Sequence, residues 1–400
     1  MTFTSAVLGL LRRPSSGTKV NTILTTAGTA GSLISNFVMR LVIARGYGPE
    51  PLGLYAIALG YQRVAGPVAD AGLHYALLRR ASTNQEVLRS GISLKMLIGL
   101  AIGALALLPS LIPALDQEVR VAIVLGAAGV VGWSQLDSAQ LWLRGHSRFS
   151  ADLALHTSTS ALRVAAALIA LRLGSTVPVA LAIYFLLPVL ASLVIPLPWA
   201  RPALPEGMLR ASATSFGYRT LWLLWLNVDV LVLGWLLDIG TVGLYEAARS
   251  LAYPVLALAD GAAIAVFQHL GAGRGAERDT ARSLTRIALV GVVAAPVAGA
   301  VAYLALGVVY GPAFASVELA AVFTLLYTGF ICATAATPYA STLLFIRPAA
   351  VLGLTALDVL LSATAYAALA SAGLVAVAFA ACMVQALNLT VLVVLSRRSL

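Results

Sequence analysis

Charged residues are scarce in this chain, and long polar segments are missing. Of its 400 residues only 10% are charged, whereas 60% are hydrophobic and the mean hydropathy is +0.93. Because a soluble domain carries about 25% charged residues, this composition excludes a soluble globular protein and indicates an all-α polytopic membrane protein. The apolar runs are rich in Leu, Ala, Val and Gly and do not alternate, which favours spanning helices over the strands of a barrel.

Cysteines and recognisable catalytic motifs are also few. Cys332 and Cys382 both lie in apolar runs, so the sequence has neither a disulfide framework nor the ligand spacing of a metal site. No P-loop pattern occurs, which excludes a P-loop site for nucleotide hydrolysis within the chain. Carboxylates and histidines do not gather beside a sizeable loop, as a membrane glycosyltransferase would need. We therefore predict no enzyme activity, no catalytic residue, no cofactor and no metal.

Runs of roughly 20 apolar residues predict the helices that cross the membrane. There are twelve such runs, with approximate limits 22–44, 52–77, 92–113, 121–143, 152–172, 177–199, 215–236, 241–268, 284–309, 315–337, 348–371 and 374–396. We expect an interfacial segment at 1–21, an N-lobe of helices 1–6 at 22–199, a linker at 200–214, a C-lobe of helices 7–12 at 215–396 and a tail at 397–400.

The basic residues predict the orientation of these helices. Most of the 26 Lys and Arg residues, Lys95 among them, are assigned to alternate loops, which the positive-inside rule places in the cytoplasm together with both termini. Cytoplasmic anchoring explains the net charge of +10, so no nucleic-acid partner is expected.

One stretch of the second predicted helix returns in the eighth. Gly53-Leu54-Tyr55 reappears as Gly243-Leu244-Tyr245, and Ala69-Asp70 reappears as Ala259-Asp260, both after a shift of 190 residues. Because that shift covers six spans, an even number, the two halves should run in the same direction through the bilayer. This is the plan of a parallel internal repeat, with two six-helix lobes around an axis along the membrane normal.

Ionisable and polar residues inside the predicted spans are the candidate binding residues. Arg63 lies about 16 Å below the outer end of its helix, and Asp70 lies on the same helical face. Such groups need partners or water inside a membrane, and a cleft between the lobes would supply both. The candidate residues are Asn36, Arg40, Arg63, Asp70, Asn227, Asp229, Glu246, Arg249, Tyr253 and Asp260.

Some of these charges also have structural explanations. Arg40 lies close enough to its helix end to extend to the interface. Glu246 and Arg249, three residues apart, can pair within one helix. Arg163 and Asp137 are interpreted as a structural pair that joins the fifth and fourth spans.

Several short stretches resemble the bacterial polysaccharide-transport family, the flippases of O-antigen and exopolysaccharide synthesis. "ARGYGPEPLGLY" at 44–55, the Asp70-Ala71-Gly72 step and the Arg79-Arg80 cluster are similar to its N-terminal signature. "WLNVDVLVLGWLLDIGTVGLYEAARSLAYPVLALAD" at 225–260 is similar to the opening of its second lobe, and "LRGHSRF" at 143–149 to one of its loops.

This resemblance implies a multidrug-extruder-like fold and a flippase of the bacterial cytoplasmic membrane. Its substrate would be a polyprenyl-diphosphate-linked oligosaccharide, with membrane lipid, a polysaccharide polymerase and glycosyltransferases as further partners. Arg63 and Arg249 could then donate to phosphate oxygens, while Asp70, Asp229 and Asp260 could receive sugar hydroxyls, pair with the arginines or bind a coupling cation. Two alternatives stay open, a cation-coupled drug extruder of the same fold and a non-transporting scaffold of the glycan machinery.

Overall fold

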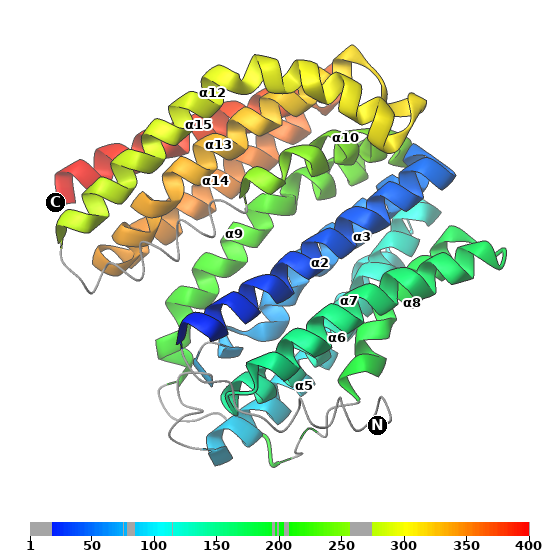
Figure 1. Ribbon diagram of the computed structural model, residues 1–400, viewed down its shortest axis with the longest axis vertical. Coiled ribbons are helices and arrows are strands. Elements are labelled where there is room, and N and C mark those ends of the chain that lie inside the picture. The colour runs from blue at the N-terminus through cyan, green and yellow to red at the C-terminus, as the bar shows by residue number, and fades with distance from the viewer. Residues whose placement is uncertain are drawn as a thin grey trace. The chain divides into compact units, whose positions relative to one another are not determined.

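Most of the described part of the chain is helical. The computed structural model describes residues 18–74, 76–77, 85–113, 115–193, 197, 200–203, 208–256 and 274–399. Within these ranges it forms twelve α-helices and no strand (Figure 1), namely α2 (Thr18–Tyr47), α3 (Pro49–Asp70), α5 (Gln85–Leu105), α6 (Gln117–Gly145), α7 (Phe149–Arg172), α8 (Val177–Ser192), α9 (Met208–Leu236), α10 (Ile239–Ala252), α12 (Arg274–Tyr310), α13 (Val317–Ile346), α14 (Pro348–Leu369) and α15 (Leu374–Ser399). Each predicted span overlaps one of these helices, so the predicted all-α fold is confirmed.

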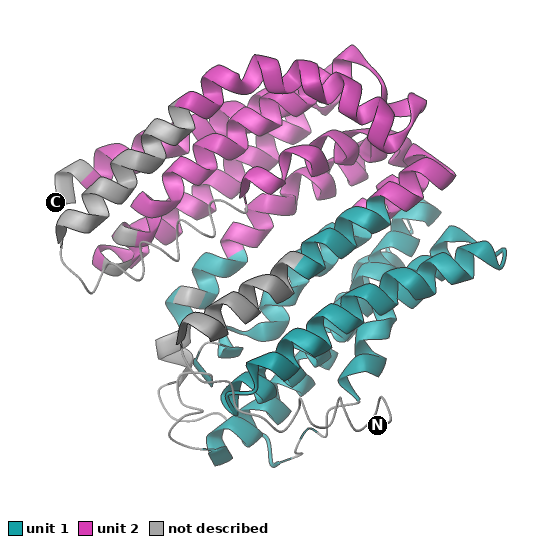
Figure 2. Ribbon diagram, in the orientation of Figure 1, with its two compact units in different colours: residues 1–40, 57–220 teal, residues 41–56, 221–400 magenta. Residues whose placement is uncertain are grey.

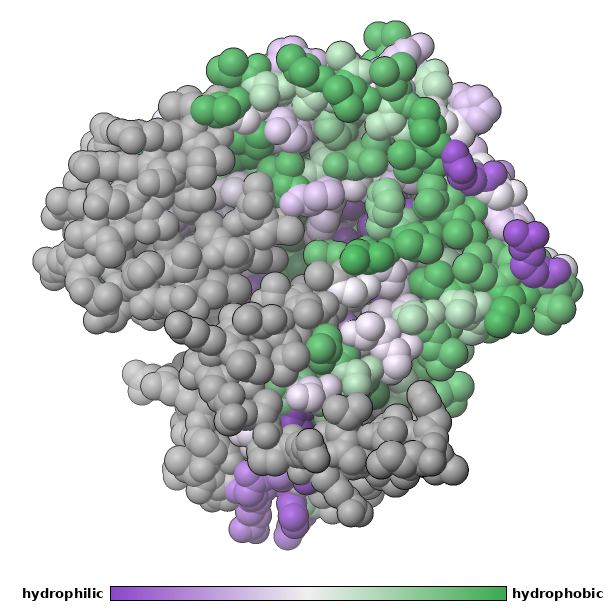
Figure 3. Space-filling view, viewed as in Figure 1, coloured by the Kyte–Doolittle hydropathy of each residue, from purple (hydrophilic) through white to green (hydrophobic). Residues whose placement is uncertain are grey.

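Eight of the described helices are long and apolar enough to cross a membrane. The surface agrees with this, because hydrophobic side chains cover much of the described face in Figure 3. On α12 the most exposed ones recur every three or four residues and therefore form one stripe, which consists of Val290, Val293, Val297, Val301, Leu304 and Val308. The stripe extends about 27 Å along the helix, close to the thickness of the hydrocarbon layer.

The helices form two compact units (Figure 2). Unit 1 contains Met1–Arg40 and Ile57–Thr220, and unit 2 contains Leu41–Ala56 and Leu221–Leu400. The end of α2 and the start of α3 thus belong to unit 2, although the rest of both helices belongs to unit 1. All three boundaries between the units fall inside a helix, in α2, α3 and α9.

The repeated glycines meet each other inside unit 2, where the starts of α3 and α10 cross. A Cβ atom on Gly53 would lie 1.9 Å from the carbonyl oxygen of Ile239, and one on Gly243 would lie 1.8 Å from that of Pro49. Pro49 and Ile239 are themselves 190 residues apart, so the two contacts are equivalent under the repeat. The Gly-Leu-Tyr signature therefore marks a symmetric point of close backbone approach that no larger residue can occupy.

We predict that Gly53→Ala and Gly243→Ala each lower the free energy of unfolding by about 1–3 kcal/mol, because the added methyl group forces two backbones apart. Gly66→Ala in the same helix is the control, since its Cβ would meet only Trp133, at 3.9 Å. Thermal unfolding in detergent measures both effects. Equal midpoints for Gly53→Ala and Gly66→Ala would contradict the close crossing.

The start of α10 is fixed by an N-cap that responds to pH. Asp238 accepts hydrogen bonds from the Thr241 hydroxyl (2.6 Å) and backbone amide (2.8 Å), which hold the pKa of the Asp238 carboxyl below its ordinary value. We predict that Asp238→Ala costs about 1 kcal/mol at neutral pH. Because the folded pKa is depressed, this difference should be complete above the ordinary carboxyl pKa of about 4 and fade as the pH falls below it. Unfolding midpoints of both proteins from pH 7 to pH 3 measure it.

Candidate functional site

Arg249 is the centre of a buried charge cluster in unit 2. The Arg249 cluster comprises Asp229 on α9 and Tyr245, Glu246 and Arg249 on α10. Arg249 is 2% exposed, and its Nη1 donates to Glu246 Oε2 at 2.9 Å. Its Nε lies 2.9 Å from Asp229 Oδ2, a close ion pair although the N–H is not aligned with that oxygen. The predicted pairing of Glu246 with Arg249 is therefore confirmed.

Further hydrogen bonds complete the coordination of Asp229. The Tyr245 hydroxyl donates to Oδ2 at 2.9 Å, and the backbone amide of Val230 donates to Oδ1 at 2.8 Å. Arg249 Nη2 donates to the carbonyl of Leu226. Arg249 thus pairs with two carboxylates within the unit. Buried charges need such partners in a low-dielectric interior.

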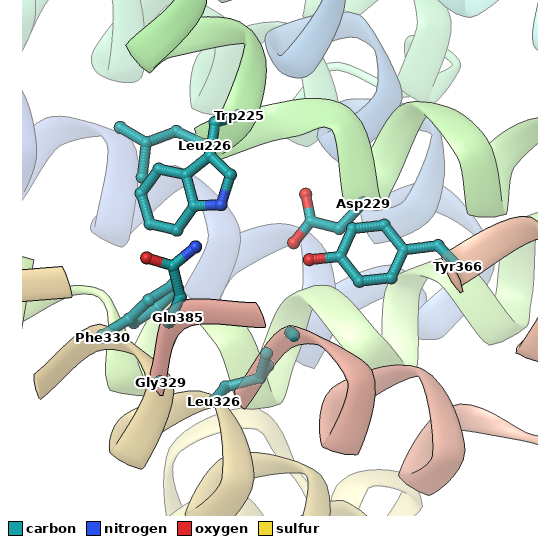
Figure 4. Close-up of a pocket in the computed structure, with 9 residues that line it drawn as sticks. Trp225, Leu226, Asp229, Leu326, Gly329, Phe330, Tyr366 and Gln385 are labelled. Carbon is teal, nitrogen blue, oxygen red and sulfur yellow. The ribbon is translucent and has the colours of Figure 1, made fainter. Parts of the chain in front are cut away.

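A small cavity adjoins this cluster, between α9, α13, α14 and α15. Figure 4 shows the Asp229 carboxylate and the Tyr366 hydroxyl on one side and the Gln385 amide on the other. Gln385 is 2% exposed, and its Oε1 has no hydrogen-bond partner. The cavity volume is about 20 Å³ (space for the centres of water-sized molecules), enough for one water or a small cation but far too little for a sugar.

The sequence analysis missed the polar group behind this cavity. Asp358 on α14 is buried and accepts hydrogen bonds from Gln385 Nε2 (3.1 Å) and Asn388 Nδ2 (2.9 Å) on α15. Its signal was present, because an aspartate stands alone in an apolar run and two amides follow three residues apart in the next run. An amide-bound carboxylate of this kind could also hold a small cation.

Unit 1 contains a second buried charge cluster around Lys95. The Lys95 cluster comprises Asp70 at the end of α3, His74 just after the turn that follows, Lys95 on α5 and Asp137 on α6. The Lys95 ammonium is 1% exposed and contacts Asp70 Oδ1 and Asp137 Oδ2. His74 Nδ1 lies 3.0 Å from the same Asp137 oxygen. The expectation that Lys95 belongs to a loop is therefore wrong, because a helix carries it into the protein interior.

Arg163 forms a third network, on α2, α7 and α8. Its Nη2 donates to Asn36 Oδ1 at 3.1 Å, and its guanidinium lies 4.6 Å from the ring centroid of Tyr184. The Tyr184 hydroxyl donates to the same Asn36 oxygen at 2.6 Å. The predicted pairing of Arg163 with Asp137 is wrong, since Arg163 binds Asn36 and Asp137 binds Lys95 and His74. Helical phase within one helix could not fix which neighbour each side chain would meet.

The remaining candidate residues lie in different settings. Arg40 is 5% exposed in α2, so it does not extend to an interface as expected. Asn227 donates to the carbonyl of Leu223 in its own helix at 2.8 Å. Tyr253 follows the end of α10 and packs edge-on against Phe330. Asp260 lies outside the described residues. Arg63, in the second half of α3, is partly exposed.

Among known families, the one described as polysaccharide biosynthesis protein matches residues 19–267. No curated protein sequence is significantly similar. Several solved structures share the fold at low identity. A multidrug resistance MATE transporter of the MOP superfamily, inward-facing, is 17% identical with a TM-score of 0.69, over 92% of this chain and 94% of its own.

Two further structures show the same likeness. The lipid II flippase MurJ, in an inward closed conformation, is 14% identical with a TM-score of 0.70, over 94% and 87% of the two chains. A MOP superfamily transporter from Pyrococcus furiosus is 17% identical with a TM-score of 0.66, over 97% and 96%. The chain thus has the fold that these transporters share.

We predict that Arg249→Gln lowers the free energy of unfolding by about 3–5 kcal/mol, because two buried carboxylates lose their cation. Adding Asp229→Asn and Glu246→Gln should restore part of this loss by removing the unpaired charges. Arg172→Gln, at the exposed end of α7, is the control and should change stability by less than about 0.5 kcal/mol. Thermal unfolding in detergent measures all three, and a similar midpoint for the two single variants would refute the ion-pair assignment.

Proposed function

Because the chain belongs to the polysaccharide biosynthesis protein family, we propose that it is a flippase for a polyprenyl-diphosphate-linked oligosaccharide. It is a multi-pass membrane protein with the fold of MOP superfamily transporters. The proposed substrate moves from the cytoplasmic to the outer leaflet of the bacterial cytoplasmic membrane during surface polysaccharide synthesis. Both termini then lie in the cytoplasm, and a polymerase and glycosyltransferases act on the same glycan.

The partial exposure of Arg63 within a predicted membrane span is the observation that carries this proposal. Four arginines lie well inside the predicted spans, and three of them, Arg40, Arg163 and Arg249, are at most 6% exposed. Arg63 alone of these four is partly exposed, in the second half of an apolar helix. A guanidinium in that position can donate two hydrogen bonds to a phosphate group, and it keeps its charge at any physiological pH.

The size of the cavity supports binding outside the interior of the units. The cavity beside Asp229 has room for one water or a small ion, so it cannot hold an oligosaccharide head group, and we place that group at the surface of unit 1 instead. The prenyl tail needs no protein site, because it can remain in the lipid. Arg63 on unit 1 would then meet the diphosphate.

The other candidate residues are proposed to have two kinds of role, one structural and one in direct contact with the glycan. In our proposal Asp70, Asp229, Glu246 and Arg249 keep the two units rigid through their ion pairs, so that a moving unit carries its binding surface intact. The direct contacts proposed for Asn36, Arg40, Asn227, Tyr253 and Asp260 with the glycan stay predictions.

We predict that Arg63→Ala inserts normally but lowers glycan export at least tenfold, because a hydrogen bond to a charged group contributes about 1.5–3 kcal/mol. Arg63→Lys should be intermediate, since lysine keeps the charge but loses the two-pronged geometry. Arg172→Ala, at the exposed end of α7, is the control and should export normally. The measurement is the amount of surface glycan in a strain that lacks its own copy, with protein levels checked by immunoblot.

The same strains separate the flippase from its two alternatives. A flippase mutant accumulates lipid-linked oligosaccharide in the inner leaflet and keeps its resistance to cationic drugs. Loss of drug resistance with normal glycan export would instead support an extruder. Full export by Arg63→Ala would overturn the proposal. So would normal glycan export in cells whose only copy of the protein cannot move the lipid-linked oligosaccharide across the membrane, because that result would indicate a scaffold.

A further inference from the structure

Three side chains of the Lys95 cluster have the arrangement of a cation site. Asp70, His74 and Asp137 each offer one ligand atom, and these atoms lie within 4.8 Å of one another. Two carboxylates and an imidazole form a donor set that binds divalent metal ions of the first transition series. Asp70 ends α3, His74 follows the turn after that helix, and Asp137 lies on α6.

The chain itself supplies a cation to this donor set. The Lys95 ammonium is in hydrogen-bond contact with one oxygen of Asp70 and one oxygen of Asp137. With 1% of its surface exposed, this ammonium has exchanged its water shell for the two carboxylates. An ammonium is a compact charge with three donors, so it can take the place of a small ion between them.

The backbone holds the donors in place independently of Lys95. The helix α3 ends at Asp70, and the next two residues, Ala71 (φ 49°) and Gly72 (φ 68°), have left-handed backbone conformations. That turn aims His74 at Asp137. Beyond it, Leu73 and Leu77 pack in a hydrophobic core with α5 and α6, through Leu88, Ile92 and Leu141. This packing keeps the turn in position whatever fills the space between the carboxylates.

We propose that Asp70, His74 and Asp137 form a cation site of unit 1, and that Lys95 fills it as a tethered cation. When the tether is removed, the site accepts a free cation of matching charge and size, either a divalent metal ion or a small primary ammonium ion. An ordinary ion pair makes a different prediction. Without the imidazole donor and the converging geometry, deletion of the lysine would leave separate carboxylates with no affinity for ions.

The assignment has a consequence for transport, and this step alone rests on the proposed function. A tethered cation cannot leave during a transport cycle, so this site does not exchange ions with either side of the membrane. A cation that drives transport has to bind elsewhere in the chain. The Lys95 cluster then acts as a permanent clamp of α3 on α5 and α6.

The experiment compares wild-type protein with Lys95→Ala, purified in detergent and stripped of metal. Co²⁺ is the first probe, because its visible absorption reports nitrogen and oxygen ligands. We expect Lys95→Ala to bind one Co²⁺ per chain at least tenfold more tightly than the wild type, and its unfolding midpoint to rise with Co²⁺. Ethylammonium chloride is the second probe, and it should raise the midpoint of Lys95→Ala but not that of the wild type.

Two double variants test which residues are ligands and keep the experiment decisive if Lys95→Ala does not fold. Lys95→Ala/His74→Ala should lose most of the Co²⁺ affinity but keep the response to ethylammonium. If Lys95→Ala does not fold without a cation, Lys95→Ala/Asp70→Asn carries one buried charge less and keeps two of the ligands, so it should still bind Co²⁺ more tightly than the wild type. Equal Co²⁺ binding by all variants and the wild type, or folded variants that bind no ion, would overturn the proposal. Neither readout depends on transport, so the result stands apart from the flippase assay.

Discussion

Compensation of buried charge within each unit is the constraint on which this structure depends. Lys95 forms ion pairs with two carboxylates in unit 1, and Arg249 forms ion pairs with two in unit 2. Charges at such depth are tolerated in a membrane only when partners surround them. The Lys95 cluster joins α3, α5 and α6, and the Arg249 cluster joins the consecutive helices α9 and α10, so both fix contacts between helices as well as the electrostatics. Apolar packing alone, in a chain so rich in Leu, Ala and Val, specifies such geometry less sharply.

These ion pairs bear on where the proposed diphosphate substrate can bind. Among the described residues, Asp70, Asp137, Asp229 and Glu246 already pair with Lys95 or Arg249, and the cavity beside Asp229 has room for only one water or a small ion. In our proposal the diphosphate therefore meets Arg63, a partly exposed guanidinium on α3. A flippase with most of its charge inside and little at the surface would suit a large amphiphilic cargo, because strong contacts along the whole route would hold the cargo and slow its release.

The sequence predicted the positions of the helices better than the side-chain contacts between them. Helix positions follow from apolar runs, and the pairing of Glu246 with Arg249 follows from their spacing in one helix. The repeat was visible in Gly53 and Gly243, although the backbone contact that explains it was not. Pairings between helices were missed, because a sequence does not give the rotation of one helix against another. Lys95 was misassigned for a related reason. It lies on α5, and what buries it is the packing of α3 and α6 around that helix, which the sequence does not give.

The location of the unit boundaries affects how such a chain can change shape. They fall within α2, α3 and α9 rather than in loops. A rotation of one unit against the other would therefore bend these continuous helices, and their backbone hydrogen bonds resist bending. A flexible loop at the same boundary would offer no such resistance. In the proposed transport cycle, part of the work done in one half would then be stored as bending of these three helices and returned in the other half.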